Sequence, residues 1–259
     1  MTENKEKESN PVGGVSVHIQ DLNKSFGDHH VLKNINLEIG RGETFSIIGP
    51  SGTGKSILLR HIIRLESPDS GQIYINDQPL FVKGTKQFTS PCRSSMVFQS
   101  SALFNSLTVN ENVGLWLREH RISSEDKIER VIAEKLAIVG LEGKGDLNIS
   151  ELSGGMKKRV AIARSLAMEP ELVLYDEPTA ELDPITTDEL AETIMSVRQK
   201  TANTTIIVTH DLSFALYLSD RIAMMNRGEI IAVGTPAEIR ESPHPDVQRF
   251  IRTTTKGIQ

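Results

Sequence analysis

Hydrophobic and polar residues follow two different patterns along the chain. In residues 15–19 and 35–39 apolar positions alternate with polar ones, which is typical of strands with one buried and one solvated face. Three other runs, 45–48, 172–175 and 206–208, lack this alternation and are apolar except at Ser46. Such runs are typical of strands buried on both faces of a parallel sheet. The pattern therefore predicts an α/β fold with two kinds of sheet.

A helical period replaces the strand patterns between residues 100 and 167. Within it, one helix face is formed by Ile128, Val131, Ile132, Leu136 and Val139. Ser123 or Ser124 precedes this face as an N-cap, and Gly140 follows it as a stop. We predict a helical insert that is too short and too poor in heptads to form a long coiled-coil arm.

The two ends of the chain differ from its middle. Residues 1–13 are polar and charged, so we expect a flexible tail that cannot bury enough apolar surface to fold. Near the other end, apolar runs at 221–225 and 229–233 flank Asn226-Arg227-Gly228, which predicts a hairpin. We place one main domain at 14–240 and a C-terminal extension at 241–259.

A glycine-rich motif lies directly after the apolar run at 44–48. It comprises Gly49, Pro50, Ser51, Gly52, Thr53, Gly54, Lys55 and Ser56. A helical pattern follows to about residue 66, and this strand–loop–helix order is the context of a phosphate-binding loop. The glycines let backbone N–H groups surround phosphate oxygens, Lys55 adds positive charge and the Ser56 hydroxyl can ligate Mg²⁺. The helix N-terminus points its dipole at the same anion.

Two other buried runs also end in polar residues. Asp176 and Glu177 follow the run at 172–175, and His210 follows the run at 206–208. Because ligands of open α/β sheets bind beyond the carboxyl ends of parallel strands, these groups should meet the phosphate loop. Asp176 would hold Mg²⁺, Glu177 would orient and polarise the attacking water, and His210 would lie at the terminal phosphate of ATP.

A second anion-binding element opens another helical pattern. Ser153, Gly154 and Gly155 precede residues 156–166, so their free N–H groups and the hydroxyl face along a helix dipole. We find no internal repeat, and the chain thus has two phosphate-binding elements but one set of Mg²⁺ and water-activating residues. A symmetric dimer resolves this mismatch, because each ATP would lie between the first element of one subunit and the second element of its mate.

Composition narrows the classes of function. The chain has 259 residues, of which 38% are hydrophobic, and a formal charge of −5, which argues against nucleic acid as the default partner. No apolar run approaches the roughly 18 residues that a membrane helix needs, so we expect a soluble or membrane-peripheral protein. Cys92 is the single cysteine, which excludes an internal disulfide. We therefore expect a reducing cytoplasm as the compartment and an unreactive, structural role for this thiol.

Taken together, the motifs resemble the ATP-binding-cassette (ABC) ATPase family over residues 14–240. The resemblance rests on the phosphate loop, Gln99 after Val97-Phe98, Ser153-Gly154-Gly155, Asp176-Glu177-Pro178, Leu182-Asp183 and His210. It implies a P-loop NTPase fold of the ABC type, with a mixed central sheet, an antiparallel β subdomain and a helical subdomain at about 100–167. It also implies ATP hydrolysis with Mg²⁺ as cofactor.

The resemblance assigns roles to three further residues. It implies that Gln99 reaches Mg²⁺ or the attacking water and senses a membrane partner, and that Asp183 communicates across the dimer. It implies that Phe26 stacks on adenine, although a core aromatic is the alternative interpretation.

A narrower resemblance links the chain to the ATPases of Mla/Mce-type phospholipid transporters. It is carried by residues 98–109, 111–113, 117–120, 151–156 and 183–185, including a signature that ends in Met156 rather than the more usual Gln. Glu181, at a position usually held by a small residue, and the segment 114–116 depart from the pattern. Trp116 could anchor a permease helix or simply pack within the helical insert.

The narrower resemblance implies a set of partners and a location. The partners are a second copy of the chain, an integral membrane permease, an MCE lipid-binding protein and a STAS-domain regulator. The location is the cytoplasmic face of a bacterial inner membrane, where the protein would be peripheral.

Three alternative functions remain open at this point. The ATPase could belong to an importer of amino acids or other polar solutes. A soluble ABC ATPase acting on DNA or ribosomes would be expected to have a long coiled coil or tandem cassettes. A regulatory module without hydrolysis is disfavoured by the presence of Lys55, Asp176, Glu177 and His210.

Overall fold

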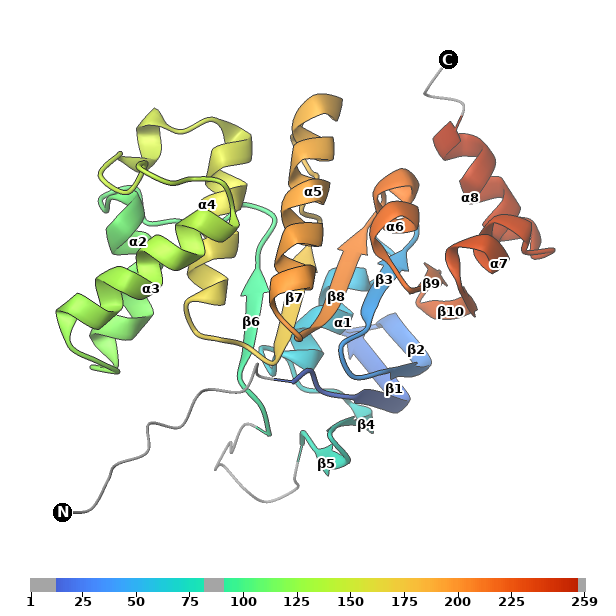
Figure 1. Cartoon of the computed structure of the whole chain (residues 1–259). Helices are drawn as coiled ribbons and strands as arrows, with labels where there is room; N and C mark the ends of the chain where they lie inside the picture. Colours follow the sequence, from blue (N-terminus) through green and yellow to red (C-terminus); the bar gives the residue numbers. More distant parts are fainter. Residues whose placement is uncertain (1–12, 82–90, 256–259) are drawn as a thin grey trace.

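The computed structural model describes residues 13–81 and 91–255 (Figure 1). Almost all of the predicted N-terminal tail therefore lies outside the described residues. None of the helices in the described ranges combines the length and the apolar composition that crossing a bilayer requires.

A six-stranded sheet forms the centre of the molecule, with strand order β10-β9-β3-β8-β7-β6. Its strands are β3 (Thr44–Ile48), β6 (Ser94–Val97), β7 (Leu172–Asp176), β8 (Thr204–Thr209), β9 (Arg221–Asn226) and β10 (Glu229–Gly234). Every neighbouring pair is parallel except β9 and β10. β3, β7 and β8 are buried at every position, as their continuous apolar runs predict.

A four-stranded antiparallel sheet, ordered β2-β1-β4-β5, packs beside the central one. It contains β1 (Val17–Phe26), β2 (His29–Ile39), β4 (Ser70–Ile75) and β5 (Gln78–Pro79). The alternating residues of β1 and β2 place one apolar set in the core, so the predicted half-buried strands are confirmed. The prediction of two kinds of sheet is confirmed with them.

Helices cover both faces of the central sheet. On one face α1 (Lys55–Ile62) buries Leu58, Leu59 and Ile62 between the two sheets. On the other face, α5 (Pro184–Lys200) and α6 (Leu212–Leu218) pack on the opposite-facing residues of β7 and β8. α1 ends four residues earlier than predicted, because Arg64 adopts φ 61° and the Leu65 N–H bonds back to the Arg60 carbonyl at 2.8 Å.

The predicted helical subdomain is confirmed next to β6, at one end of the sheet (Figure 1). It comprises α2 (Val109–Glu119), α3 (Glu125–Ile138), the short 3₁₀ helix η1 (Ile149–Glu151) and α4 (Gly154–Leu166). Of the two candidate N-caps of α3, the structure selects Ser124, and Gly140 follows the end of the helix with φ 67°. Apolar residues of all three α-helices share one core cluster with β6 and β7.

The C-terminal elements lie at the opposite end of the sheet (Figure 1). β9 and β10 form the predicted hairpin, with Arg227 and Gly228 both at positive φ in its turn. α7 (Pro236–Glu241) and α8 (Pro245–Thr255) follow. Val247 of α8 is fully buried against residues of β9 and α6, so the segment after 240 packs onto the domain. The domain boundary predicted at 240 falls inside α7.

Candidate functional site

The predicted phosphate loop opens onto a cavity of about 370 Å³ at the carboxyl ends of β3, β7 and β8. Its lining residues are His29, Val31, Ser51, Gly52, Gly54, Lys55, Ser56, Ile57, Gln99, Glu177, Ala180 and His210. Because β8 pairs with β3 on one side and β7 on the other, the three polar strand ends are neighbours. The expectation that they meet is confirmed.

The phosphate loop has the backbone that its glycines predict. Gly49 has φ 148°, and a Cβ there would lie 2.1 Å from the Met225 carbonyl oxygen, so a side chain cannot be accommodated. Thr53 Oγ1 donates to the Pro50 carbonyl at 3.0 Å across the loop. Gly54, with φ 102°, is the N-cap of α1 and directs the free N–H groups of that helix toward the cavity.

Lys55 lies at the floor of the cavity and is almost fully buried. Its ammonium donates to the Gly49 carbonyl at 2.9 Å and the Pro50 carbonyl at 3.0 Å, and lies 3.5 Å from Glu177 Oε1. Burial lowers the pKa of Lys55, and the Glu177 carboxylate opposes that change. A buried cation of this kind is suited to receive additional negative charge from a phosphate.

Glu177 joins this lysine to the end of β8. Its Oε2 accepts from the His210 backbone N–H at 3.1 Å and lies 2.8 Å from His210 Nδ1. Glu177 has φ 46°, a left-handed conformation that is uncommon for a non-glycine residue. The carboxylate is thus held at the cavity wall by Lys55 at the start of α1 and by His210 after the end of β8.

Two oxygen atoms suited to Mg²⁺ meet where α1 begins and β7 ends. Ser56 Oγ donates to Asp176 Oδ1 at 2.6 Å, and Gln99 lines the same cavity. Burial raises the pKa of Asp176. Within the described residues, no group of three or more His, Cys, Asp or Glu could hold a metal ion. This set therefore fits Mg²⁺ that keeps water and substrate phosphate oxygens among its ligands.

The adenine-stacking residue predicted by resemblance does not line this cavity. Phe26 ends β1 with 45% of its surface exposed, and the Lys24 ammonium lies 5.1 Å from its ring centroid. His29 and Val31, across the same hairpin, line the cavity instead. Sequence analysis missed both, since neither belongs to a motif and the hairpin reaches the loop only through folding.

The second anion-binding element also lies outside the cavity of its own protomer. Ser153 is the N-cap of α4, where its Oγ accepts from Met156 N at 3.3 Å. Asp183 is the N-cap of α5 and accepts from Thr186 N and Thr186 Oγ1 at 3.0 and 2.6 Å. Hydrogen bonds from Thr186 lower the pKa of Asp183, so it is a stable exposed anion. One protomer does not bring the two elements together.

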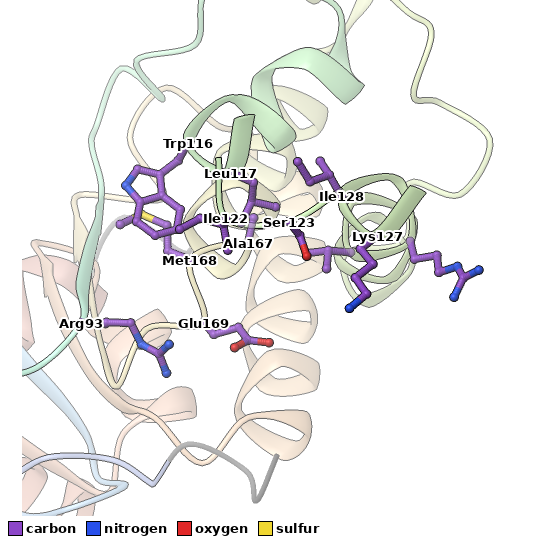
Figure 2. A pocket seen from close by; sticks show the side chains of 12 residues that line it. Arg93, Trp116, Leu117, Ile122, Ser123, Lys127, Ile128, Ala167, Met168 and Glu169 are labelled. Carbon is purple, nitrogen blue, oxygen red and sulfur yellow. The ribbon is translucent and has the colours of Figure 1, made fainter. Parts of the chain in front are cut away.

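A second cavity, of about 400 Å³ and mostly apolar, lies in the helical subdomain. Figure 2 shows Trp116, Leu117 and Met168 near Ile122, with Lys127 and Ile128 of α3 opposite. Trp116 is half-buried and stacks on His120 with ring centroids 4.7 Å apart. It packs partly on the core and partly faces this cavity, so the two interpretations of Trp116 are compatible.

Known proteins match both the sequence and this fold. The family model for the ABC transporter matches residues 32–180. Protein TRIGALACTOSYLDIACYLGLYCEROL 3, chloroplastic, of Arabidopsis thaliana is 40% identical, covering 94% of this chain and 75% of the relative. The L-cystine import ATP-binding protein TcyN of Bacillus subtilis is 41% identical, covering 91% of this chain and 92% of the relative.

A solved structure also matches the fold. It is a dimeric ATP-binding cassette in a post-hydrolysis state with ADP and phosphate bound, with TM-score 0.73 and 32% identity over 85% of this chain and 98% of the other. The chain therefore belongs to the ABC transporter family, as one of its ATP-hydrolysing proteins.

Proposed function

We propose that this ATPase works as a homodimer that drives an integral membrane permease for phospholipid or a related lipid. A dimer is supported by one observation: Ser153-Gly154-Gly155 does not line the nucleotide cavity of its own protomer. A twofold partner supplies the missing half of the site. The dimeric, ADP-bound neighbour supports this arrangement.

Each residue of the cavity has a part in the proposed hydrolysis. Lys55 and the loop N–H groups bind the outer phosphates, and Ser56, Asp176 and Gln99 hold Mg²⁺, which supplies positive charge to the transferring phosphate. Glu177 orients the attacking water and accepts its proton, and His210 positions Glu177 through the contact at 2.8 Å. Asp183 communicates with the partner site, and Phe26 stacks on adenine.

Closure on ATP binding and reopening after hydrolysis would move the helical subdomain. We place the permease contact at the apolar cavity beside Trp116 and Leu117. Arg93, Lys127 and Arg130 give its lining more positive than negative charge, with Glu169 as the single acid. This surface suits a permease helix with apolar side chains and an acidic residue.

Two observations support a lipid as the transported substrate. They are the segments that resemble Mla/Mce-type ATPases and the name of the Arabidopsis relative, which refers to a galactolipid. The partners proposed with the permease are an MCE lipid-binding protein and a STAS-domain regulator. The proposed location is the cytoplasmic face of a bacterial inner membrane. An importer of amino acids or other polar solutes is the second candidate, and the 41% identity to an L-cystine import protein favours it.

The deciding experiment is to purify the ATPase together with its native membrane partner and to identify the bound lipid by mass spectrometry. We expect one lipid class to be enriched over the bulk membrane, and we expect that lipid to raise ATP turnover of the reconstituted complex. A tag-free preparation from the same membranes controls for carried-over lipid. Absence of enrichment, together with stimulation by a polar solute, would overturn the lipid proposal and favour the importer.

A further inference from the structure

Phe26 lies at the end of β1, next to a strand that lines the nucleotide cavity. It pairs across the hairpin with His29 of β2, which is one of the lining residues. Directly opposite residues of an antiparallel pair lie about 5 Å apart and have their side chains on the same face. A nucleobase that extends past His29 can therefore reach the Phe26 ring.

The Lys24 ammonium covers one face of this ring. It lies over the ring, 5.1 Å from its centroid, which is within the range of a cation–π interaction. The Lys24 side chain is 12% exposed, whereas Phe26 is 45% exposed. Phe26 is thus not a core residue, and its ring keeps exposed surface for a planar ligand while Lys24 supports it.

Lys24 is held over the ring by residues 66–69, the segment that connects α1 to β4, which we call the lysine-binding segment. The ammonium donates to the Ser67 carbonyl at 2.8 Å. The Glu66 and Asp69 carboxylates lie 3.0 and 3.4 Å from the same nitrogen. Asp69 also accepts from Ser25 N at 2.6 Å, so the segment is fixed to β1. Three oxygen atoms thus meet the three N–H donors of one ammonium.

These contacts favour the charged form of the lysine. Burial lowers the pKa of Lys24, but Glu66 and Asp69 together outweigh burial and raise that pKa above its ordinary value. The hydrogen bond from Lys24 in turn lowers the pKa of Glu66. A charged ammonium is attracted by the negative face of an aromatic ring, whereas an apolar side chain of similar length is not.

The helix α1 connects the lysine-binding segment to the phosphate loop. α1 begins at Lys55, which is part of that loop, and ends at Ile62. The turn that follows is closed by Leu65 N, which donates to the Arg60 carbonyl at 2.8 Å. The phosphate loop and the support for Phe26 therefore lie at the two ends of one helix.

We propose that Lys24 is a positioning residue for the nucleobase, because it holds the Phe26 ring in the orientation that stacks on adenine. The lysine-binding segment fixes Lys24, and α1 ties that segment to the loop that binds the phosphates. This inference rests on the role proposed for Phe26 and adds to it the means by which the ring is held.

Calorimetric titration of the full-length protein with ADP or with inorganic diphosphate, both with Mg²⁺, separates base binding from phosphate binding. We expect Lys24→Met to raise the Kd for ADP by about three- to fivefold, the size of an exposed cation–π interaction. The Kd for diphosphate should stay within about 1.5-fold of the parent, which also shows that the variant is folded. Lys24→Arg keeps a cation that stacks on aromatic faces and should restore most of the lost affinity.

Steady-state turnover provides a second measurement on the same variants. The KM for ATP should rise in Lys24→Met while kcat is unchanged, because the lost contact is made equally in the ground state and the transition state. A fall in kcat with unchanged KM would overturn the inference, since the lysine would then act on the chemistry.

Lys33→Met is the matched control. Lys33 is a lysine of the neighbouring strand β2 that is half-buried, like Lys24, and does not line the cavity. Its replacement removes the same charge from the same sheet and should leave the Kd for ADP unchanged. An equal loss of ADP affinity in Lys33→Met, an equal loss of diphosphate affinity in Lys24→Met, or parental ADP affinity in Lys24→Met would overturn the inference.

Glu66→Gln tests the lysine-binding segment. It should raise the Kd for ADP by about twofold, as expected for a partly exposed ion pair. Added to Lys24→Met it should have no further effect, because its partner is already absent. Additive losses would show that Glu66 does not act through Lys24.

Phe26→Ala separates this inference from the role on which it rests. We expect it to raise the Kd for ADP by about 10-fold, the size of one base–aromatic stacking contact. If Phe26→Ala binds ADP with parental affinity, Phe26 does not stack on adenine, and the inference fails with that role. If Phe26→Ala is impaired while Lys24→Met is not, the role of Phe26 stands and this inference alone is wrong.

Discussion

Glu177 is held in a position that suits a catalytic residue. Its side chain is 12% exposed and lies between a buried lysine at 3.5 Å and His210 at 2.8 Å, with its backbone at φ 46°. A residue placed only for stability would avoid this conformation, which carries a cost of order 1 kcal/mol or more. These contacts aim one carboxylate at the space above the phosphate loop.

Glu177→Gln should therefore abolish turnover while preserving ATP binding. We expect kcat to fall by at least about 100-fold, the usual contribution of a general base, because the amide keeps the shape but cannot accept the proton. Phosphate release measures turnover, and fluorescence of a bound nucleotide analogue measures affinity. Glu142→Gln, in an exposed loop, is the control. Parental turnover in Glu177→Gln would mean that another group activates the water.

At the scale of elements, the segment between β6 and α2 is held in place by one buried side chain. Asn112 of α2 is fully buried, and its Oδ1 accepts from Phe104 N at 2.9 Å. Its Nδ2 donates to the carbonyls of Phe104, Leu107 and Thr108 at 3.1, 3.2 and 2.9 Å. With Lys158 and Arg164 on α4, whose side chains donate to backbone carbonyls of the same segment, this amide gives an irregular segment a defined path from the nucleotide to the helical subdomain.

Asn112→Ala should lower the free energy of unfolding by about 2–3 kcal/mol, because it removes the partners of several backbone groups at once. Urea denaturation followed by circular dichroism measures this change. Asn105→Ala alters an exposed asparagine of the same segment and should shift the unfolding free energy by less than about 0.5 kcal/mol. Equal effects in both variants would show that Asn112 does not hold the segment.

At the scale of the whole molecule, the two phosphate-binding elements are both present and both formed, yet they do not share a cavity. α4 is capped by Ser153 and packs against the start of α5, so its N-terminus is already ordered in one protomer. In a symmetric dimer, the ordered Ser153 element of one protomer would complete the site that the phosphate loop of its partner begins.

Glu177→Gln should consequently become a dimer when ATP and Mg²⁺ are added, as measured by sedimentation velocity. Adding Ser153→Glu should prevent that dimer and leave monomer ATP affinity unchanged, because the new carboxylate repels phosphate only across the interface. Ser70→Glu, at an exposed position of β4, introduces the same charge away from both elements. If the Ser153→Glu protein still dimerises with ATP, the second element does not bind the partner's nucleotide.

The sequence by itself determined the helical subdomain, the chemistry of the phosphate loop and the strands of the central sheet other than β6. These features depend on short-range physics: the period of apolar residues, the backbone freedom of Gly49 and the cap of α3 at Ser124. The order of motifs was enough to place Asp176, Glu177 and His210 beside one another, because parallel strands align their carboxyl ends.

Only the tertiary structure decided how distant segments approach each other. His29 and Val31 enter the nucleotide cavity because two sheets pack together, and α8 joins the core through Val247. The Lys158 ammonium of α4 meets the backbone carbonyl of Gln99 only in the folded chain. Such contacts join residues many positions apart, and their energy depends on burial and distance, neither of which a local pattern records.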